Sequence, residues 1–557
     1  MSYWPGFKIK GKSILKSVMS SSMLFYVFKL LITALWQTFL IRFCYTAFYL
    51  IHRFFYFTYY KFPYIHDSYF FGNTLRLCPD FPFLSKRGTP LLDAMKFYTQ
   101  QFPKSFFVEW IFAYPIVIAT DYELIHNVLA CRDNIDKGVS YTFLEESFEQ
   151  GLLTSNGSKW RYRRKLIEPT VGLRMLSSFL PIMKRNTDIL IEDLRDKTGT
   201  QINLNDEIDR VALKVILQTA IGLSDEYLAE YIDEHVSNTR KVTQYCVFRV
   251  RNPILWITPI RKIYELWSGV SKTNKKFREF AVRAIHQKMQ ARINSLSRKR
   301  GSRGSIKDQN SSKMMIPNQR KVFIDLLIDK YFESLKDNNP YRIDEKGLYE
   351  EVQLLVFAGF DTSSTTIKWT LYNLGLNPAI QEKLYQEVST FKLDDDDDLD
   401  PDYLKNFVYL EQVIKEGLRI RPTVPIVVRE LGKDIFYKGF RIPKGTDVLA
   451  SMFSVHSNPD IYPNPEEFNP DRFSPENIDK IPSKAFIPFA TGPRKCIGRN
   501  YAMMEMKVII ANVVKNFRII AKTPMDQIKY DLDMVSAPKD PLMVTLLPRR
   551  SLSVTEP

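Results

Sequence analysis

Apolar residues at helical spacing dominate the pattern of this 557-residue chain. The clearest examples are residues 352–376 and 504–517, where apolar positions recur every three or four residues. Short β-rich runs at 115–120, 425–431 and 542–548 predict strands scattered between the helices. We see no internal repeat that would indicate a solenoid or propeller. The pattern predicts one large, mainly α-helical domain with a small β region.

A separate apolar segment lies near the N-terminus, at residues 22–41. Twenty helical residues span about 30 Å, the thickness of the hydrocarbon core of a bilayer. Aromatic stretches follow it as far as residue 60 and are typical of an interfacial anchor. The alternatives are a cleaved signal peptide and a mitochondrial presequence, but no small-residue cleavage site closes the run. We expect residues 1–62 to be a retained membrane anchor in front of a catalytic domain at 63–557.

The net charge of +16 is concentrated in two places. Residues 1–66 carry eight Lys or Arg and no acid, which gives +8. Residues 292–321 carry nine Lys or Arg against Asp308, another +8, so the remainder is nearly neutral. This distribution argues against a nucleic-acid-binding face. Residues 297–320 are predicted to be a basic linker, and the aspartates at 394–398 a solvated loop.

The five cysteines are widely spread and contain no CxxC pair. Their spacing argues against a disulfide framework or a zinc site and suits a reducing compartment. Cys496 alone has distinctive neighbours, in the segment FATGPRKCIG at 489–498. Gly492 and Gly498 permit close backbone approach, Arg494 can reach an anion, and a helical run follows at once. We interpret the segment as a thiolate site for a large anionic cofactor.

The same segment resembles the F-x-x-G-x-R-x-C-x-G signature of the cytochrome P-450 superfamily, the heme-thiolate monooxygenases, at all its specified positions. The stretches around 151–170, 409–431 and 486–508 are similar to the fourth P-450 family and its relatives. The resemblance covers nearly the whole chain after about residue 70. It implies a cytochrome P-450 fold and a heme b held by Cys496 as axial ligand to the iron.

The resemblance also assigns roles to residues elsewhere. In AGFDT, at 358–362, Gly359 would leave room for dioxygen, the Thr362 hydroxyl would steady the oxygen bound at the iron, and Asp361 would help to deliver protons. Glu416 and Arg419 would form a structural triad with Arg472 that holds the cysteine loop, and His456 would be structural. The expected heme-binding residues are Trp160, Arg164, Arg429, Phe489, Arg494 and Gly498.

Two departures from the fourth family bear on the pocket. Ala358 stands where many members carry a glutamate that esterifies heme, so we expect non-covalent heme. Phe360 replaces a histidine and would make the distal pocket more apolar. The expected pocket residues are Ala358, Phe360, Ile426 and Val427. In residues 252–267, Leu255, Trp256 and Ile257 would either dip into a membrane interface or pack beneath a loop.

Together these features predict a monooxygenase that hydroxylates a lipophilic substrate, either a fatty acid, a sterol-like molecule or a xenobiotic. NADPH-derived electrons would come from a separate reductase, with cytochrome b5 as a second partner, because the chain has no GxGxxG motif. A basic surface of Arg161, Arg163, Lys165, Lys495 and Arg499 would suit such a partner. We expect an endoplasmic reticulum membrane protein with a cytosolic catalytic domain, or alternatively a mitochondrial one. The alternative functions are a P-450-fold isomerase or dehydratase, and a non-catalytic heme-binding protein.

Overall fold

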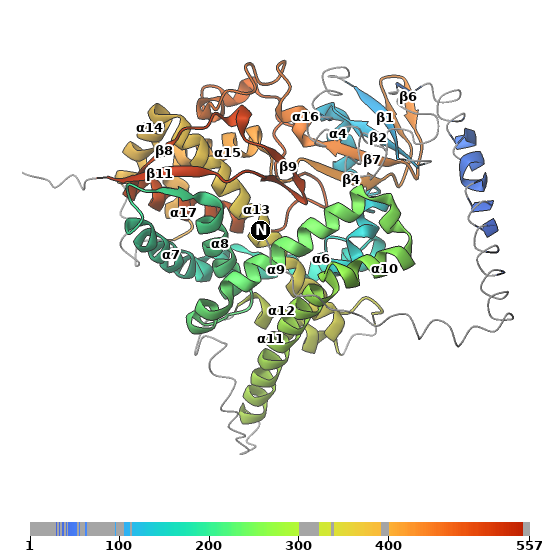
Figure 1. Cartoon of the computed structure of the whole chain (residues 1–557), viewed down its shortest axis with the longest axis horizontal. Coiled ribbons are helices and arrows are strands. Elements are labelled where there is room, and N and C mark those ends of the chain that lie inside the picture. The colour runs from blue at the N-terminus through green and yellow to red at the C-terminus, as the bar shows by residue number, and fades with distance from the viewer. Residues whose placement is uncertain are drawn as a thin grey trace, which may run out of the picture.

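The structure is a computed structural model that describes residues 105–111, 114–299, 322–335, 339–390 and 400–549, with scattered residues before 105 (Figure 1). Most of the predicted anchor at 22–41 lies outside the described residues. The same holds for most of the predicted linker at 297–320 and for the aspartates at 394–398. Within the described part of the chain, no helix has the length and apolar character needed to span a membrane.

Helix α13 (Glu345–Leu376) runs through the centre of the molecule (Figure 1). It begins where the Asp344 side chain accepts a hydrogen bond from the Gly347 amide at 2.7 Å, a standard N-cap. It ends at Asn377, and Pro378 then starts α14 (Pro378–Ser389). α13 packs against α8 (Leu204–Ala220), α15 (Val408–Ile420) and α17 (Arg499–Asn516). Neighbouring elements surround both α13 and α17. Both helices are therefore buried on nearly all faces over most of their length.

The other α-helices in the described part of the chain lie around this centre or on the largest sheet. They are α4 (Tyr122–Ala130), α5 (Glu145–Phe148), α6 (Gly157–Ile167), α7 (Leu173–Arg195), α9 (Asp225–Arg251), α10 (Thr258–Trp267), α11 (Val270–Lys299), α12 (Phe323–Ser334) and α16 (Met452–His456). α11 extends three residues into the segment that we predicted to be linker.

The β structure forms four small sheets. The largest has the order β1-β2-β7-β4, in which β2 (Tyr114–Ala119) lies parallel to β7 (Asp447–Ser451) and antiparallel to β1 (Phe106–Ile111). β4 (Ile426–Glu430) lies antiparallel to β7, with Arg429 opposite Val448. The other sheets are β3-β11-β8, β9-β10 and β5-β6, formed by β3 (Gln201–Asn203), β8 (Phe517–Ala521), β11 (Met543–Pro548), β9 (Tyr530–Asp533), β10 (Val535–Pro538), β5 (Ile435–Tyr437) and β6 (Phe440–Ile442).

Most of the described hydrophobic core belongs to two large clusters, beside two small ones. The larger lies between α7, α8, α13, α15 and α17, and the smaller packs the largest sheet against α4 and α16. In Figure 1 the two regions occupy different sides of the molecule, with α13 near its middle. The prediction of a mainly helical fold with a small β region is confirmed, and the three predicted strands are β2, β4 and β11.

Candidate thiolate and anion site

The loop that carries Cys496 is fixed by close backbone contacts. The Cys496 amide donates to the Phe489 carbonyl at 2.9 Å and closes the loop. Gly492 has a φ of +74°, and a Cβ there would lie 2.0 Å from the Leu129 carbonyl oxygen at the end of α4. Glycine is therefore required at 492 both for its dihedral angle and for the space. Helix α17 begins at Arg499, three residues after Cys496.

The surroundings of the Cys496 thiol include groups that raise its pKa and groups that lower it. Burial raises the pKa of the thiol. The backbone N–H groups of Gly498 and Arg499, together with the charges of Arg164 and Arg499, act in the opposite direction and favour the thiolate. Although protein atoms crowd the thiol on the side of the loop, Cys496 as a whole is exposed to solvent. An exposed cysteine with hydrogen-bond donors beside it is better suited to bind a metal or cofactor than to fill core space.

Three cationic side chains lie close together at this loop: Arg494, which belongs to it, and Arg429 and Lys137. Burial and repulsion from Arg429 lower the pKa of Arg494 to about 9, and Asp136 offsets this only in part. Burial lowers the pKa of Arg429, and burial with repulsion from both arginines lowers the pKa of Lys137 far more. The Nε atom of Arg429 is buried and, among the described residues, has no hydrogen-bond partner. Such a cluster fits an anionic group, and two carboxylates of heme would supply that charge.

Arg494 is held by carbonyl groups rather than by acids. It donates to the backbone oxygens of Ile135 at 2.8 Å and Leu152 at 3.2 Å, and to that of Ser155. Its guanidinium lies 4.2 Å from the centre of the Trp160 ring. Sequence motifs did not point to Lys137, because its position beside Arg429 and Arg494 is set by the tertiary fold.

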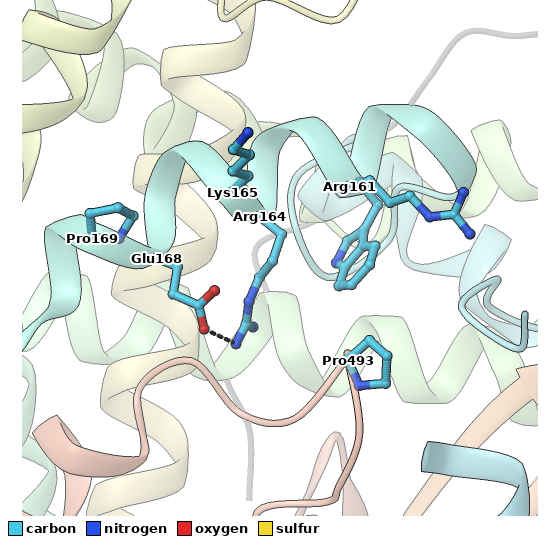
Figure 2. A pocket seen from close by; sticks show the side chains of 7 residues that line it. Arg161, Arg164, Lys165, Glu168, Pro169 and Pro493 are labelled. Carbon is cyan, nitrogen blue, oxygen red and sulfur yellow. Dashed lines mark hydrogen bonds and ion pairs between the residues drawn. The ribbon is translucent and has the colours of Figure 1, made fainter. Parts of the chain in front are cut away.

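Trp160 and Arg164 lie one turn apart on α6, and both are buried, as their spacing indicated. Arg164 donates to the Lys495 carbonyl at 3.0 Å and pairs with Glu168 at 3.1 Å, so α6 is tied directly to the cysteine loop. Figure 2 shows the pair of Arg164 and Glu168, which lines a pocket of about 490 Å³. Its lining consists of Trp160, Arg161, Arg164, Lys165, Glu168, Pro169 and Pro493.

The predicted basic surface needs one correction. Arg163 is only 3% exposed, because its guanidinium is enclosed by Glu350 and Glu351 of α13. The prediction that it belongs to the surface was wrong, since helical periodicity turns it toward α13 while Arg161 and Lys165 face outward.

In the middle of α13, Ala358 and Thr362 are accessible although most of the helix is buried. The Thr362 hydroxyl donates to the Ala358 carbonyl at 2.7 Å, and Asp361 is half-buried beside it. Phe360 points to the opposite face and packs in the larger core cluster at 1% exposure. It therefore does not line a pocket, and our prediction for it was wrong.

Gly359 also differs from expectation. A Cβ at this position would lie 2.6 Å from the Cδ1 atom of Ile216 on α8. The glycine thus allows α8 to pack closely on α13, and this packing accounts for its missing side chain without reference to dioxygen.

The triad of Glu416, Arg419 and Arg472 is assembled. Arg419 binds Glu416 through two bonds of 2.7 and 2.8 Å, and both side chains are fully buried. Arg472 approaches Glu416 at 3.4 Å. Arg419 also donates to the His456 carbonyl, and Nε2 of His456 accepts from the Ile487 amide at 3.2 Å. The contacts run from α15 to the segment just before the cysteine loop.

The other two expected pocket residues, Ile426 and Val427, are neighbours on β4, so their side chains point to opposite faces of the sheet. Ile426 is half-buried, whereas Val427 packs in the smaller core cluster and cannot line a pocket.

In the 252–267 segment, Leu255 is buried and the Trp256 indole donates to the Arg249 carbonyl at 3.0 Å. Leu255 therefore follows the packing alternative, Trp256 is half-buried, and the exposed Ile257 fits the interfacial alternative. The exposed apolar residues continue along α10, at Ile260, Ile263, Leu266 and Trp267.

An exposed cysteine ahead of a buried helix, with buried cations beside it, is the arrangement expected of a protein that holds an anionic cofactor through a thiolate. The sequence model of the family described as Cytochrome P450 matches residues 81–546, and the chain belongs to this family. Cytochrome P450 4V2 of Homo sapiens is 30% identical over 485 residues, which are 86% of this chain and 88% of that protein. Cytochrome P450 4c21 of Blattella germanica and 4p1 of Drosophila melanogaster are each 32% identical, over 78% and 80% of this chain and 83% and 84% of theirs. The chain is a P450 monooxygenase similar to family 4, and its cofactor is heme iron.

Proposed function

We propose that this P450 inserts an oxygen atom from O2 into a lipophilic small molecule, using NADPH-derived electrons from a separate reductase. The observation that supports the thiolate assignment best is the Cys496 loop. Cys496 is exposed, and backbone N–H groups at the start of α17 favour its charged form. Heme, when bound there, supplies the activation of dioxygen that no side chain can provide.

The residues that would hold the heme follow from the charge distribution. Cys496 would be the axial ligand, with Phe489 and Gly498 beside the sulfur. A Cβ at Gly498 would lie 4.0 Å from that sulfur, which is ordinary van der Waals contact. Trp160, Arg164, Arg429 and Arg494 would bind the two carboxylates, and we add Lys137, a buried lysine near Arg429 and Arg494 whose ammonium group lies 4.0 Å from the centre of the Tyr141 ring. Ala358 has no carboxylate to esterify the cofactor, so the heme would be non-covalent.

Proton supply would fall to Asp361 and Thr362. The Thr362 hydroxyl oxygen can accept a hydrogen bond while its own hydrogen is donated to the Ala358 carbonyl. Asp361, one residue earlier and half-buried, would exchange protons with solvent.

Membrane association is supported by the apolar segment at 22–41 and by the exposed apolar side chains of α10. We propose that the protein lies at the endoplasmic reticulum membrane with its catalytic domain in the cytosol. Arg161, Lys165, Lys495 and Arg499 would attract the acidic face of a reductase or of cytochrome b5.

Reconstitution tests this function. The full chain in phospholipid vesicles with NADPH, O2 and P450 reductase is incubated with fatty acids and sterols, and products are identified by mass spectrometry with ¹⁸O2. We expect a hydroxylated product that carries one labelled oxygen and that disappears in Cys496→Ala. Rearranged or dehydrated products formed without NADPH would instead establish an isomerase or dehydratase.

A further inference from the structure

Two consecutive glutamates near the start of α13, Glu350 and Glu351, are buried at 1% and 3% exposure. Both carboxylates contact the Arg163 guanidinium, Glu351 at 3.0 Å. Arg163 belongs to α6, the helix that also carries Trp160 and Arg164. The contact therefore fixes the position of α6 on α13.

The second oxygen of Glu351 reaches a different element. It accepts a hydrogen bond from the Leu152 amide at 3.1 Å, in the loop between α5 and α6. The carbonyl of the same residue, Leu152, accepts from Arg494 at 3.2 Å. One residue of this loop is thus held between a buried carboxylate and the arginine beside the cysteine loop. Glu350 supports the same loop more weakly, through the Gln150 amide at 3.4 Å.

The cluster is a costly way to stabilise a fold. Removing a charge from water costs several kcal/mol per ion, and apolar side chains of similar size often give equal or greater stability. Here the charges join α13 to α6, which carries Trp160 and Arg164, and to the loop before α6, whose Leu152 carbonyl binds Arg494. Fixed geometry of these groups is a better explanation than stability alone.

We propose that Glu351, supported by Glu350, is a positioning residue for the cofactor. Its hydrogen bond with the Leu152 amide fixes the loop whose carbonyl holds Arg494. Its ion pair with Arg163 fixes α6, and with it the positions of Trp160 and Arg164. The proposal rests on the proposed function of these residues in binding the heme carboxylates.

The test compares Glu351→Gln with Asp209→Asn. Asp209 is a matched control because it is also 3% exposed and also pairs with α13, through Lys368 at 2.8 Å. Its ion-pair partners, Arg240 and Lys368, lie outside α6 and the loop before it. Heme loss from each heme-loaded protein to excess apomyoglobin is followed by absorbance, and unfolding free energies are measured in parallel.

We expect Glu351→Gln to speed heme loss roughly tenfold or more, as removal of a supporting partner does at other metal sites. Asp209→Asn should lose a similar amount of unfolding free energy, but its rate of heme loss should stay within about twofold of the wild-type rate. The reason is that the Asp209 pair stabilises the fold without positioning the anion-binding residues. Equal rates for the two variants would overturn the proposal. A wild-type chain that takes up no heme would refute the proposed function instead.

Amide hydrogen exchange gives a reading that does not depend on a variant folding or on heme. The Leu152 amide of the heme-free wild-type chain should be protected, since its acceptor belongs to the protein. Exchange as fast as in an unstructured peptide would contradict the proposal.

Discussion

Replacing Gly492 by alanine should displace the Cys496 loop, and Gly439 provides a matched control. Both glycines have positive φ, +74° and +81°, so alanine brings similar backbone strain of about 1–2 kcal/mol at each. At Gly439 a Cβ meets nothing within 4 Å. At Gly492 it would lie 2.0 Å from the Leu129 oxygen, where real Cβ atoms keep at least 3.0 Å.

The loop must therefore move by about 1 Å, or α4 must yield, and such overpacking adds about 1–3 kcal/mol. We expect Gly439→Ala to lose about 1–2 kcal/mol in denaturant unfolding and to keep a normal thiolate spectrum. Gly492→Ala should lose about 2–5 kcal/mol, with a reduced fraction of thiolate-ligated heme. Equal losses and equal spectra in the two variants would refute the argument that close approach to Leu129 fixes the loop.

Two further predictions concern buried charges. Arg419→Met leaves the fully buried Glu416 without its two-bond partner, so the unfolding free energy should fall by about 3–5 kcal/mol. Replacing the half-exposed Arg210, which pairs with an exposed aspartate, should cost under about 1 kcal/mol, and similar losses would contradict the reasoning. Burial raises the pKa of Glu505 to about 8, so the folded state loses stability as pH rises from the ordinary value of 4.5 toward 8. Glu505→Gln lacks this ionisation, so the thermal midpoint of the variant minus that of wild type should increase from pH 4.5 to pH 8. A difference in midpoint that does not change with pH would refute the raised pKa of Glu505.

The sequence predicted the features that depend on local pattern. α13 and α17 follow from apolar periodicity, and the Cys496 loop from glycines and a helix start within ten residues. The pairing of Glu416 with Arg419 follows from a separation of three residues on one helix.

Features set by tertiary contacts could not be predicted in this way. Arg163 looked like a surface cation, but its partners lie 187 and 188 residues further along the chain. Phe360 lies two residues from Ala358, yet the helical turn of about 200° places it in the core. Lys137 acquires its role only because the fold brings it beside Arg429 and Arg494.

The carbon monoxide difference spectrum of the reduced, heme-loaded chain tests the central claim most directly, with wild type measured beside Cys496→Ala. The account predicts a red-shifted, thiolate-type Soret band in wild type that is lost in the variant. A band of the histidine- or thiol-ligated kind in wild type, or a thiolate band that survives the substitution, would contradict the assignment of Cys496 as the ligand.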